Sequence, residues 1–344
     1  MAPPVAKMKT IVIIMTCRDN EAQEGGRRSP CRTAGLAEAA HPRRHAGGAG
    51  GSRMGAESPA RVNPTHRTGA HMEPSGIGAV FDRAGADFAR LAPHLWDPIG
   101  QATVDAVGVR PGERVLDACC GAGGSAVPAA IATGAQGRVD AIDLAESLLA
   151  QGRERASAHG LAHLRFIHAD ATRWDAGPYD VAMCVLGVFM LPDMDAACAR
   201  LAGAVRPGGR FAVTTWAGGA LEDFGGALAD AVREERGAQP ASPASRGSVT
   251  RIDSESKLGA WLAGLGLGDV AVTRVPLELV VDEELAWLLV VGSGFRGMLD
   301  GLDERAVSRV QRTLLDALDE RGISTLDATT LVGVGHRQDA TAAS

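Results

Sequence analysis

The chain has 344 residues, of which 45% are hydrophobic and 22% are charged, so disorder cannot describe the whole chain and one large core is within reach. Its longest early apolar run, residues 11–15, is far shorter than the roughly 20 residues of a membrane helix or the apolar part of a signal peptide. We therefore expect a soluble, cytoplasmic protein with no membrane partner. The six cysteines form no CxxC pair and no disulfide-like spacing, which predicts free thiols and no metal.

The first 72 residues differ in composition from the rest. They are rich in Gly, Ala, Arg, Ser and Pro and lack periodic apolar positions, which predicts a disordered basic extension over residues 1–72. Residues 1–71 carry 11 Lys and Arg against 5 Asp and Glu, whereas the whole chain carries 35 against 41. A later start at Met54 or Met72 would also explain this stretch, so its place in the native protein stays open. The acidic remainder argues against a nucleic-acid partner.

Periodic elements follow this extension. Apolar residues at helical spacing predict an N-terminal helical lid over residues 73–110. Short apolar strands then alternate with helices over residues 111–281, which predicts an α/β core with a doubly wound, mostly parallel sheet. Strands are expected at 114–118, 137–142, 164–168, 179–186, 210–215 and 270–279, and helices at 125–133, 145–159, 194–205 and 254–265.

The last part of the chain is expected to cover and complete this core. After Trp216 the alternation loosens, and residues 237–247 form a connection rich in Gly, Pro and Ser. A helical cap insertion is predicted over residues 282–323, followed by a final core strand over 324–338. Residues 339–344 are expected to form a frayed tail.

The most informative segment is VLDACCGAGGS, residues 115–125, in which a short strand runs into an acid and then a glycine-rich turn. Gly121, Gly123 and Ala126 also satisfy the spacing of a dinucleotide-binding turn. Asp117 separates the two ligand classes, because its carboxylate would repel a diphosphate but attract an ammonium or sulfonium group. The segment therefore favours S-adenosylmethionine over a nicotinamide cofactor.

Two further acids stand at strand ends. Asp143 ends the next predicted strand, where its carboxylate can accept hydrogen bonds from both hydroxyls of a ribose. Asp170 follows the strand after that, where it can accept from an exocyclic adenine amine. An acid at the position of Asp143 is common to both cofactor classes. The order of all three acids along the chain is therefore more informative than any one of them.

Together with Tyr179-Asp180-Val181 and the proline-glycine turn at 206–211, these features resemble the class I S-adenosylmethionine-dependent methyltransferase superfamily. The runs ERVLDACCGAGG, AIDLAESLL, HADATRW and VRPGGRFAVTTW are similar to the branch that holds ubiquinone/menaquinone C-methyltransferases and bacterial natural-product methyltransferases. The resemblance covers about residues 80 to 217. It implies a seven-stranded, Rossmann-like sheet whose last strand is antiparallel. The chain departs from the commoner pattern at Cys119-Cys120, where a glycine often stands.

The resemblance also implies a cofactor, S-adenosyl-L-methionine, which leaves as S-adenosyl-L-homocysteine. By this likeness Asp117, Gly121 and Gly123 line the methionine half, Asp143 holds the ribose, and Asp170 flanks the adenine. The full expected cofactor site is Asp117, Ala118, Cys119, Gly121, Gly123, Asp143, Leu144, Asp170, Ala171 and Val185.

The acceptor is less well defined by the sequence. Among the large rings, Phe189 and Trp216 follow strand ends where an aromatic acceptor could stack. Phe295 is a third candidate contact, and Arg296 could pair with an acidic group of the substrate. Methyl transfer is an in-line displacement that needs a base only when the acceptor is protonated, and His94 is the candidate for that role.

We therefore predict an O-, N- or C-methyltransferase that acts on a small molecule of secondary metabolism. Three alternatives stay open: a quinone-type C-methyltransferase, a nicotinamide-dependent oxidoreductase, and a relative that binds the cofactor without turnover. The acceptor, the methylated atom and the oligomeric state, including a homodimer, are not set by the sequence.

Overall fold

The computed structural model describes residues 76–237 and 245–338. The extension expected over 1–72, the first residues of the expected lid and the tail expected over 339–344 lie outside the described residues, as does the middle of the connection at 237–247. None of the helices in the described ranges combines the length and apolar character needed to cross a lipid bilayer.

A seven-stranded sheet forms the centre of residues 76–338, with the strand order β3-β2-β1-β4-β5-β9-β6. The first five strands pair in parallel, whereas β9 runs antiparallel to both of its neighbours. This confirms the predicted mostly parallel sheet with an antiparallel last strand. The strands are β1 (Arg114–Ala118), β2 (Arg138–Asp143), β3 (Leu164–His168), β4 (Tyr179–Val185), β5 (Val205–Trp216), β6 (Leu267–Val275) and β9 (Thr330–Arg337).

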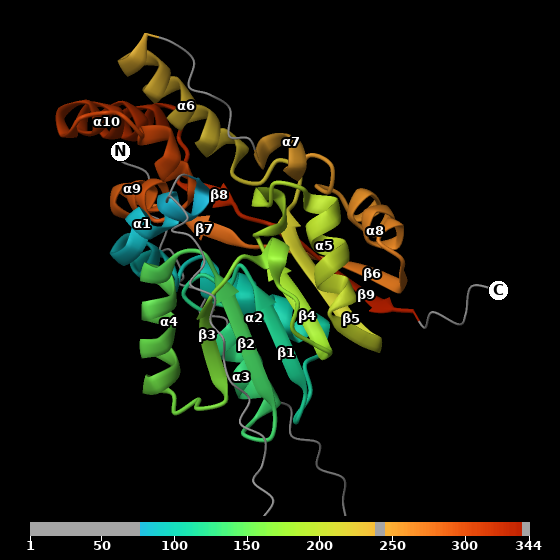
Figure 1. Ribbon diagram of the computed structural model, residues 1–344. Helices are drawn as coiled ribbons and strands as arrows, with labels where there is room; N and C mark the ends of the chain where they lie inside the picture. The colour runs from blue at the N-terminus through green and yellow to red at the C-terminus, as the bar shows by residue number, and fades with distance from the viewer. Residues whose placement is uncertain (1–75, 238–244, 339–344) are drawn as a thin grey trace, which may run out of the picture. The chain divides into compact units, whose positions relative to one another are not determined.

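Helices cover both faces of this sheet, so its central strands are apolar on both sides. Side chains of α2, α3 and α4 share a core with one face, and side chains of α5 and α8 share a core with the other (Figure 1). The bounds are α1 (Ile77–Leu91), α2 (Trp96–Val107), α3 (Ala126–Thr133), α4 (Glu146–Ala158), η1 (Ala171–Arg173), η2 (Val188–Met190), α5 (Met194–Gly203), α7 (Ser245–Val249) and α8 (Glu255–Gly264).

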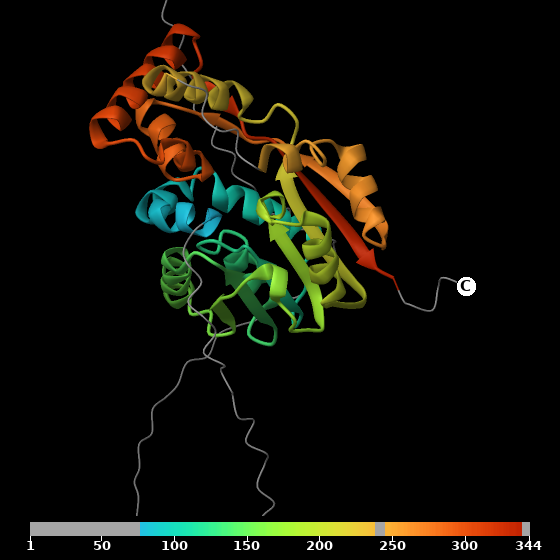
Figure 2. The same ribbon diagram turned by 45° about the horizontal axis from the view of Figure 1, so that its top comes forward.

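A second group of elements lies beyond the carboxyl ends of the strands. Residues 282–323 contain α9 (Glu283–Val291), η3 (Gly294–Leu299) and α10 (Glu304–Glu320), flanked by the two-stranded ribbon β7 (Glu278–Val280) and β8 (Thr325–Asp327). The single strand predicted at 270–279 is therefore divided between β6 and β7. Helix α6 (Glu222–Arg236), which the sequence pattern did not predict, packs against α10 (Figure 2).

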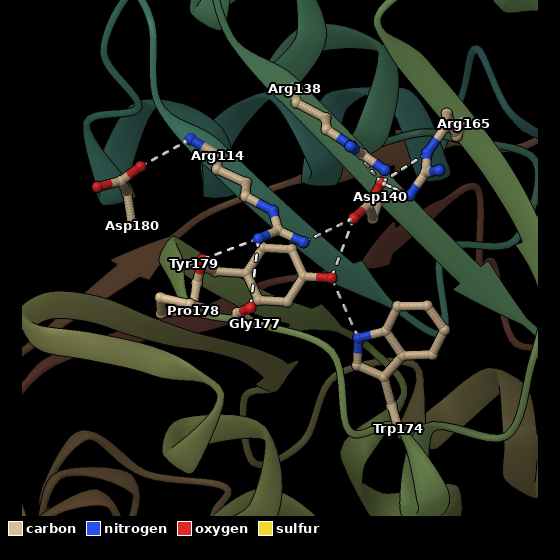
Figure 3. A network of polar contacts seen from close by, with 9 residues as sticks. All are labelled: Arg114, Arg138, Asp140, Arg165, Trp174, Gly177, Pro178, Tyr179 and Asp180. Atoms are coloured by element: carbon tan, nitrogen blue, oxygen red, sulfur yellow. Dashed lines mark hydrogen bonds and ion pairs between the residues drawn. The ribbon is translucent and has the colours of Figure 1, made fainter. Parts of the chain in front are cut away.

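Near the amino ends of the strands, the buried carboxylate of Asp140 connects β2 to β1, β3 and β4 (Figure 3). Asp140 of β2 accepts hydrogen bonds from Arg165 at 2.7 and 2.9 Å and from Arg138 at 3.2 Å. The Tyr179 hydroxyl donates to the same carboxylate at 3.0 Å, and Arg114 lies 3.6 Å away. Burial acts to raise the pKa of Asp140, but Arg165 and the other donors outweigh it and hold the pKa below its usual range.

Replacement of Tyr179 by phenylalanine tests this network. The Tyr179 hydroxyl also accepts a 3.2 Å hydrogen bond from Trp174, so the change removes two hydrogen bonds of a fully buried hydroxyl group. We expect the free energy of unfolding in urea to fall by about 1 to 2 kcal/mol. As the control, the affinity for a ligand that binds at the carboxyl ends of the strands is expected not to change. An unaltered unfolding midpoint would contradict a stabilising role for the network.

Candidate functional site

A large cavity opens at the carboxyl ends of the parallel strands, where α/β sheets usually bind their ligands. Its volume is about 2000 Å³, and its walls come from the ends of β1 to β5 and from α1, α6, α9 and η3. Pockets for a single small molecule measure roughly 300 to 1,000 Å³. The cavity therefore has room for two small molecules side by side.

The turn between β1 and α3 forms one wall of this cavity with bare backbone. Gly121 and Gly123 adopt left-handed conformations, with φ of 53° and 85°. A Cβ atom on Gly123 would lie 2.7 Å from the ring of Phe166, and one on Gly121 would lie 3.1 Å from the ring of Phe88. Cys119 is also left-handed, with φ of 58°, which is an unfavourable conformation for a residue with a side chain. The turn thus presents peptide groups, not side chains, to a ligand.

Asp117 lies directly behind this turn and is completely buried. Its Oδ2 accepts a 2.7 Å hydrogen bond from Ser125, whereas its Oδ1 has no partner among the described residues. Burial raises the pKa of Asp117 to about 7, the hydrogen bond from Ser125 opposes this rise, and the charge of Asp143 adds to it. A cation brought to the turn would compensate this half-paired carboxylate.

Asp143, at the end of β2, joins the turn to the next helix. Its Oδ2 accepts from the Gly121 N–H and its Oδ1 accepts from the Ala145 N–H, each at 2.9 Å. Burial raises the pKa of Asp143, although the hydrogen bonds from Ala145 and Gly121 counteract it. Asp143 lines the cavity, and each of its oxygens keeps a further lone pair that can accept from a hydroxyl group.

Asp170, after β3, is held in the same way by its own loop. Its Oδ1 accepts from the Thr172 N–H at 2.8 Å and from the Thr172 hydroxyl at 2.7 Å. The residue lines the cavity together with Ala169 and Ala171. The carboxylate is therefore fixed in orientation beside an apolar surface on which a flat ring can lie.

Helix α1 and the start of α2 cover the turn from above. The Asp82 side chain accepts from the Ser147 N–H at 3.0 Å, which ties α1 to the first turn of α4. The rings of Phe88 and Trp96 stack with their centroids 5.1 Å apart, and both line the cavity with Phe81. Sequence reasoning did not assign these aromatic residues to the site, although their helical spacing in the expected lid was a usable signal.

The structure brings most of the predicted site residues to this cavity. Its lining includes Cys119, Gly121, Asp143, Leu144, Asp170, Ala171 and Val185 from the cofactor set, and Phe189, Trp216 and Phe295 from the acceptor set. Asp117, Ala118 and Gly123 lie beneath the lining. The wall formed by α6, including Gly225 and Gly226, was not predicted.

Two predicted residues lie elsewhere. His94 is exposed on the turn between α1 and α2, because Leu91 and Leu95 take the buried positions of that segment. Arg296 forms a 3.4 Å ion pair with Asp87 and donates to the Val291 carbonyl at 3.1 Å, outside the cavity. The geometry therefore gives no support to His94 as a base or to Arg296 as a substrate contact.

The central part of the chain is similar to known proteins. Residues 115–209 match the model of a methyltransferase domain. The aklanonic acid methyltransferase DauC of Streptomyces sp. (strain C5) is 36% identical over 141 residues, which cover 40% of this chain and 64% of the relative. The nocamycin O-methyltransferase of Saccharothrix syringae is 32% identical over 167 residues, which cover 45% and 59%. The matches thus span less than two thirds of these relatives.

Solved structures with a similar chain course share little sequence. The YcgJ protein from Bacillus subtilis is 16% identical, with a TM-score of 0.48 over 71% of this chain and 99% of that chain. The [4+2]-cyclase SpnF is 15% identical, with a TM-score of 0.48 over 76% of this chain and 96% of that chain.

Proposed function

We propose, on the premise that residues 115–209 belong to the methyltransferase domain family, that the protein transfers a methyl group from S-adenosylmethionine to a small-molecule acceptor. The observation that carries this proposal is the buried, half-paired Asp117 behind the glycine turn. A sulfonium and an ammonium group would compensate its charge, whereas the diphosphate of a nicotinamide cofactor would be repelled.

The residues of the cavity fit the donor from one end to the other. The bare turn at Gly121 would hold the methionine half, and Asp143 would accept from the ribose hydroxyls with its remaining lone pairs. Asp170 and the apolar surface at Ala169 and Ala171 would flank the adenine. When bound, the donor supplies an electrophilic methyl group, and the residues named here bind and orient it.

The rest of the cavity fits an apolar, ring-containing acceptor. Phe189, Trp216 and Phe295 line it together with Leu289 and Met298, and aromatic rings can stack on such a wall. Orientation of the acceptor nucleophile in line with the methyl–sulfur bond accounts for the rate acceleration without a reacting side chain. The relatives named for aklanonic acid and nocamycin support a small-molecule acceptor of secondary metabolism.

Thermal unfolding in the presence of candidate ligands tests the choice of cofactor. Because a ligand that binds only the folded state stabilises it, S-adenosylhomocysteine at 100 times its Kd should raise the free energy of unfolding by about 2.7 kcal/mol. NAD and NADP at the same concentration should have no effect. Stabilisation by a nicotinamide cofactor alone would refute the proposal.

Turnover is tested separately from binding. The protein is incubated with methyl-deuterated S-adenosylmethionine and a panel of polycyclic phenols, carboxylic acids, amines and quinones, and products are detected by mass spectrometry. We expect a product that is heavier by one labelled methyl group, and its fragmentation identifies the methylated atom. Cofactor binding without any product would favour the non-catalytic alternative.

A further inference from the structure

Trp96, the first residue of α2 and a lining residue of the cavity, carries a donor without a hydrogen-bond partner among the described residues. Its indole Nε1 is buried from solvent and has no hydrogen-bond partner among the described residues. The residue itself lines the cavity. Buried N–H groups are nearly always paired in folded proteins, so an unpaired one beside a ligand cavity points to a partner supplied by the ligand.

The indole is held against the glycine turn. Its ring stacks on Phe88 with an interplanar angle of 15°, and a Cβ atom on Gly124 would lie 2.9 Å from the Trp96 carbonyl oxygen. Ser125, the next residue, donates to Asp117. Trp96 and Asp117 are therefore both packed against the Gly124-Ser125 part of the turn.

Cationic side chains are placed elsewhere on the cavity wall. Arg233 and Arg321 are the arginines among its described lining residues, and both pair with Asp230, at 2.7 and 3.3 Å, on the wall formed by α6 and the end of α10. Arg155 is nearer to the turn, but it does not line the cavity and is engaged by Asp97 and by the Ala122 carbonyl. Among the described residues, the side chains near the turn that could bind a carboxylate are therefore neutral donors.

The turn is thus flanked by one unpaired acceptor and one unpaired donor, which match the ammonium and carboxylate of an amino acid. Resting on the proposed function, we propose that Trp96 Nε1 donates a hydrogen bond to the α-carboxylate of the methionine half of the donor. Trp96 is then a binding residue that fixes the amino-acid end of the donor, while Asp117 compensates the positive charge beside it. Hydrogen bonds to a charged acceptor are the stronger ones.

A cycle of two proteins and two ligands tests this contact. Binding of S-adenosylhomocysteine and of its decarboxylated analogue, which keeps the amine, is measured by calorimetry for the wild type and for Trp96→Phe. We expect Trp96→Phe to weaken binding of S-adenosylhomocysteine about tenfold, or about 1.4 kcal/mol, and binding of the decarboxylated analogue less than twofold. The matched control is Phe88→Leu, which disturbs the stacked pair without removing an N–H and should weaken both ligands equally.

The outcomes separate this inference from the proposed function. If neither ligand binds the wild type, the proposed function fails. If S-adenosylhomocysteine binds but Trp96→Phe affects both ligands by the same factor, the function stands and the assignment of Trp96 is wrong.

A spectroscopic readout on the wild type does not depend on the stability of the variant. In protein labelled with ¹⁵N at tryptophan, the indole N–H signal of Trp96 should shift downfield with S-adenosylhomocysteine and much less with the decarboxylated analogue. The signal is assigned by its loss in Trp96→Phe or in Trp96→Tyr. Equal shifts with both ligands would overturn the proposal.

Discussion

Replacement of Asp143 by alanine is expected to weaken binding of S-adenosylhomocysteine about 100-fold. The carboxylate would lose charge-assisted hydrogen bonds to the ribose hydroxyls, each worth about 1.5 to 3 kcal/mol. It would also release the N–H groups of Gly121 and Ala145, which it now holds at 2.9 Å. The loss therefore combines a missing ligand contact with a loosened turn. Calorimetry gives the affinity, and circular dichroism confirms that the variant is folded.

Two companion variants define the origin of this loss. Asp143→Asn keeps one acceptor oxygen but turns an amide N–H toward a backbone donor, so we expect an intermediate loss of about tenfold. Asp253→Asn changes another carboxylate of the cavity wall and should alter the affinity less than twofold. Equal affinities of Asp143→Ala and the wild type would show that the ribose is bound elsewhere.

Replacement of Asp117 by asparagine is expected to stabilise the ligand-free protein at pH 8. Burial raises the pKa of Asp117 from its ordinary value of 3.8 to about 7 in the folded protein, so the folded state binds this proton more tightly than the unfolded chain does. The free energy of unfolding therefore falls as the pH rises from about 4 to 7 and stays low above 7. Asparagine mimics the protonated acid, and its unpaired amide hydrogens offset part of the gain. We expect a net gain of about 1 to 3 kcal/mol at pH 8, measured in urea, and little gain at pH 4.

The same substitution should remove a pH dependence of cofactor binding. An ammonium group of the ligand placed beside Asp117 favours the ionised carboxylate, so the wild type must release the Asp117 proton on binding below pH 7. Its affinity for S-adenosylhomocysteine should fall about tenfold from pH 8 to pH 6 relative to Asp117→Asn. Because both proteins bind the same ligand, the ratio of their two affinities at each pH is independent of the titration of the ligand amine. Parallel pH profiles would mean that Asp117 does not sense the charge of the ligand.

The core of the site follows from short stretches of sequence. A strand that carries Asp117 just before its last residue and runs into Gly121 and Gly123 leaves few conformations for the turn, because the requirement for bare backbone is local. Asp143 and Asp170 each follow a parallel strand, and such strand ends meet at one edge of the sheet. The parallel strands and the edge at which these acids meet could therefore be predicted from the residues, whereas the antiparallel last strand was implied only by the resemblance to the methyltransferase superfamily.

The outer walls could not be predicted in this way. Helix α6 carries the pair Gly225-Gly226, which obscures its helical pattern, and it is stabilised by packing against α10 far along the chain.

The side chain of His94 could act as a base and that of Arg296 could bind an acidic group. The packing of their neighbours, however, leaves His94 in solvent and pairs Arg296 with Asp87. The unpaired Trp96 Nε1 is likewise visible only after α1, α2 and the turn have packed together. The sequence alone determined the bare backbone of the glycine turn, because that geometry is set within a few residues. Only the tertiary structure decided which side chains surround it, because each of those contacts joins segments that are distant in the chain.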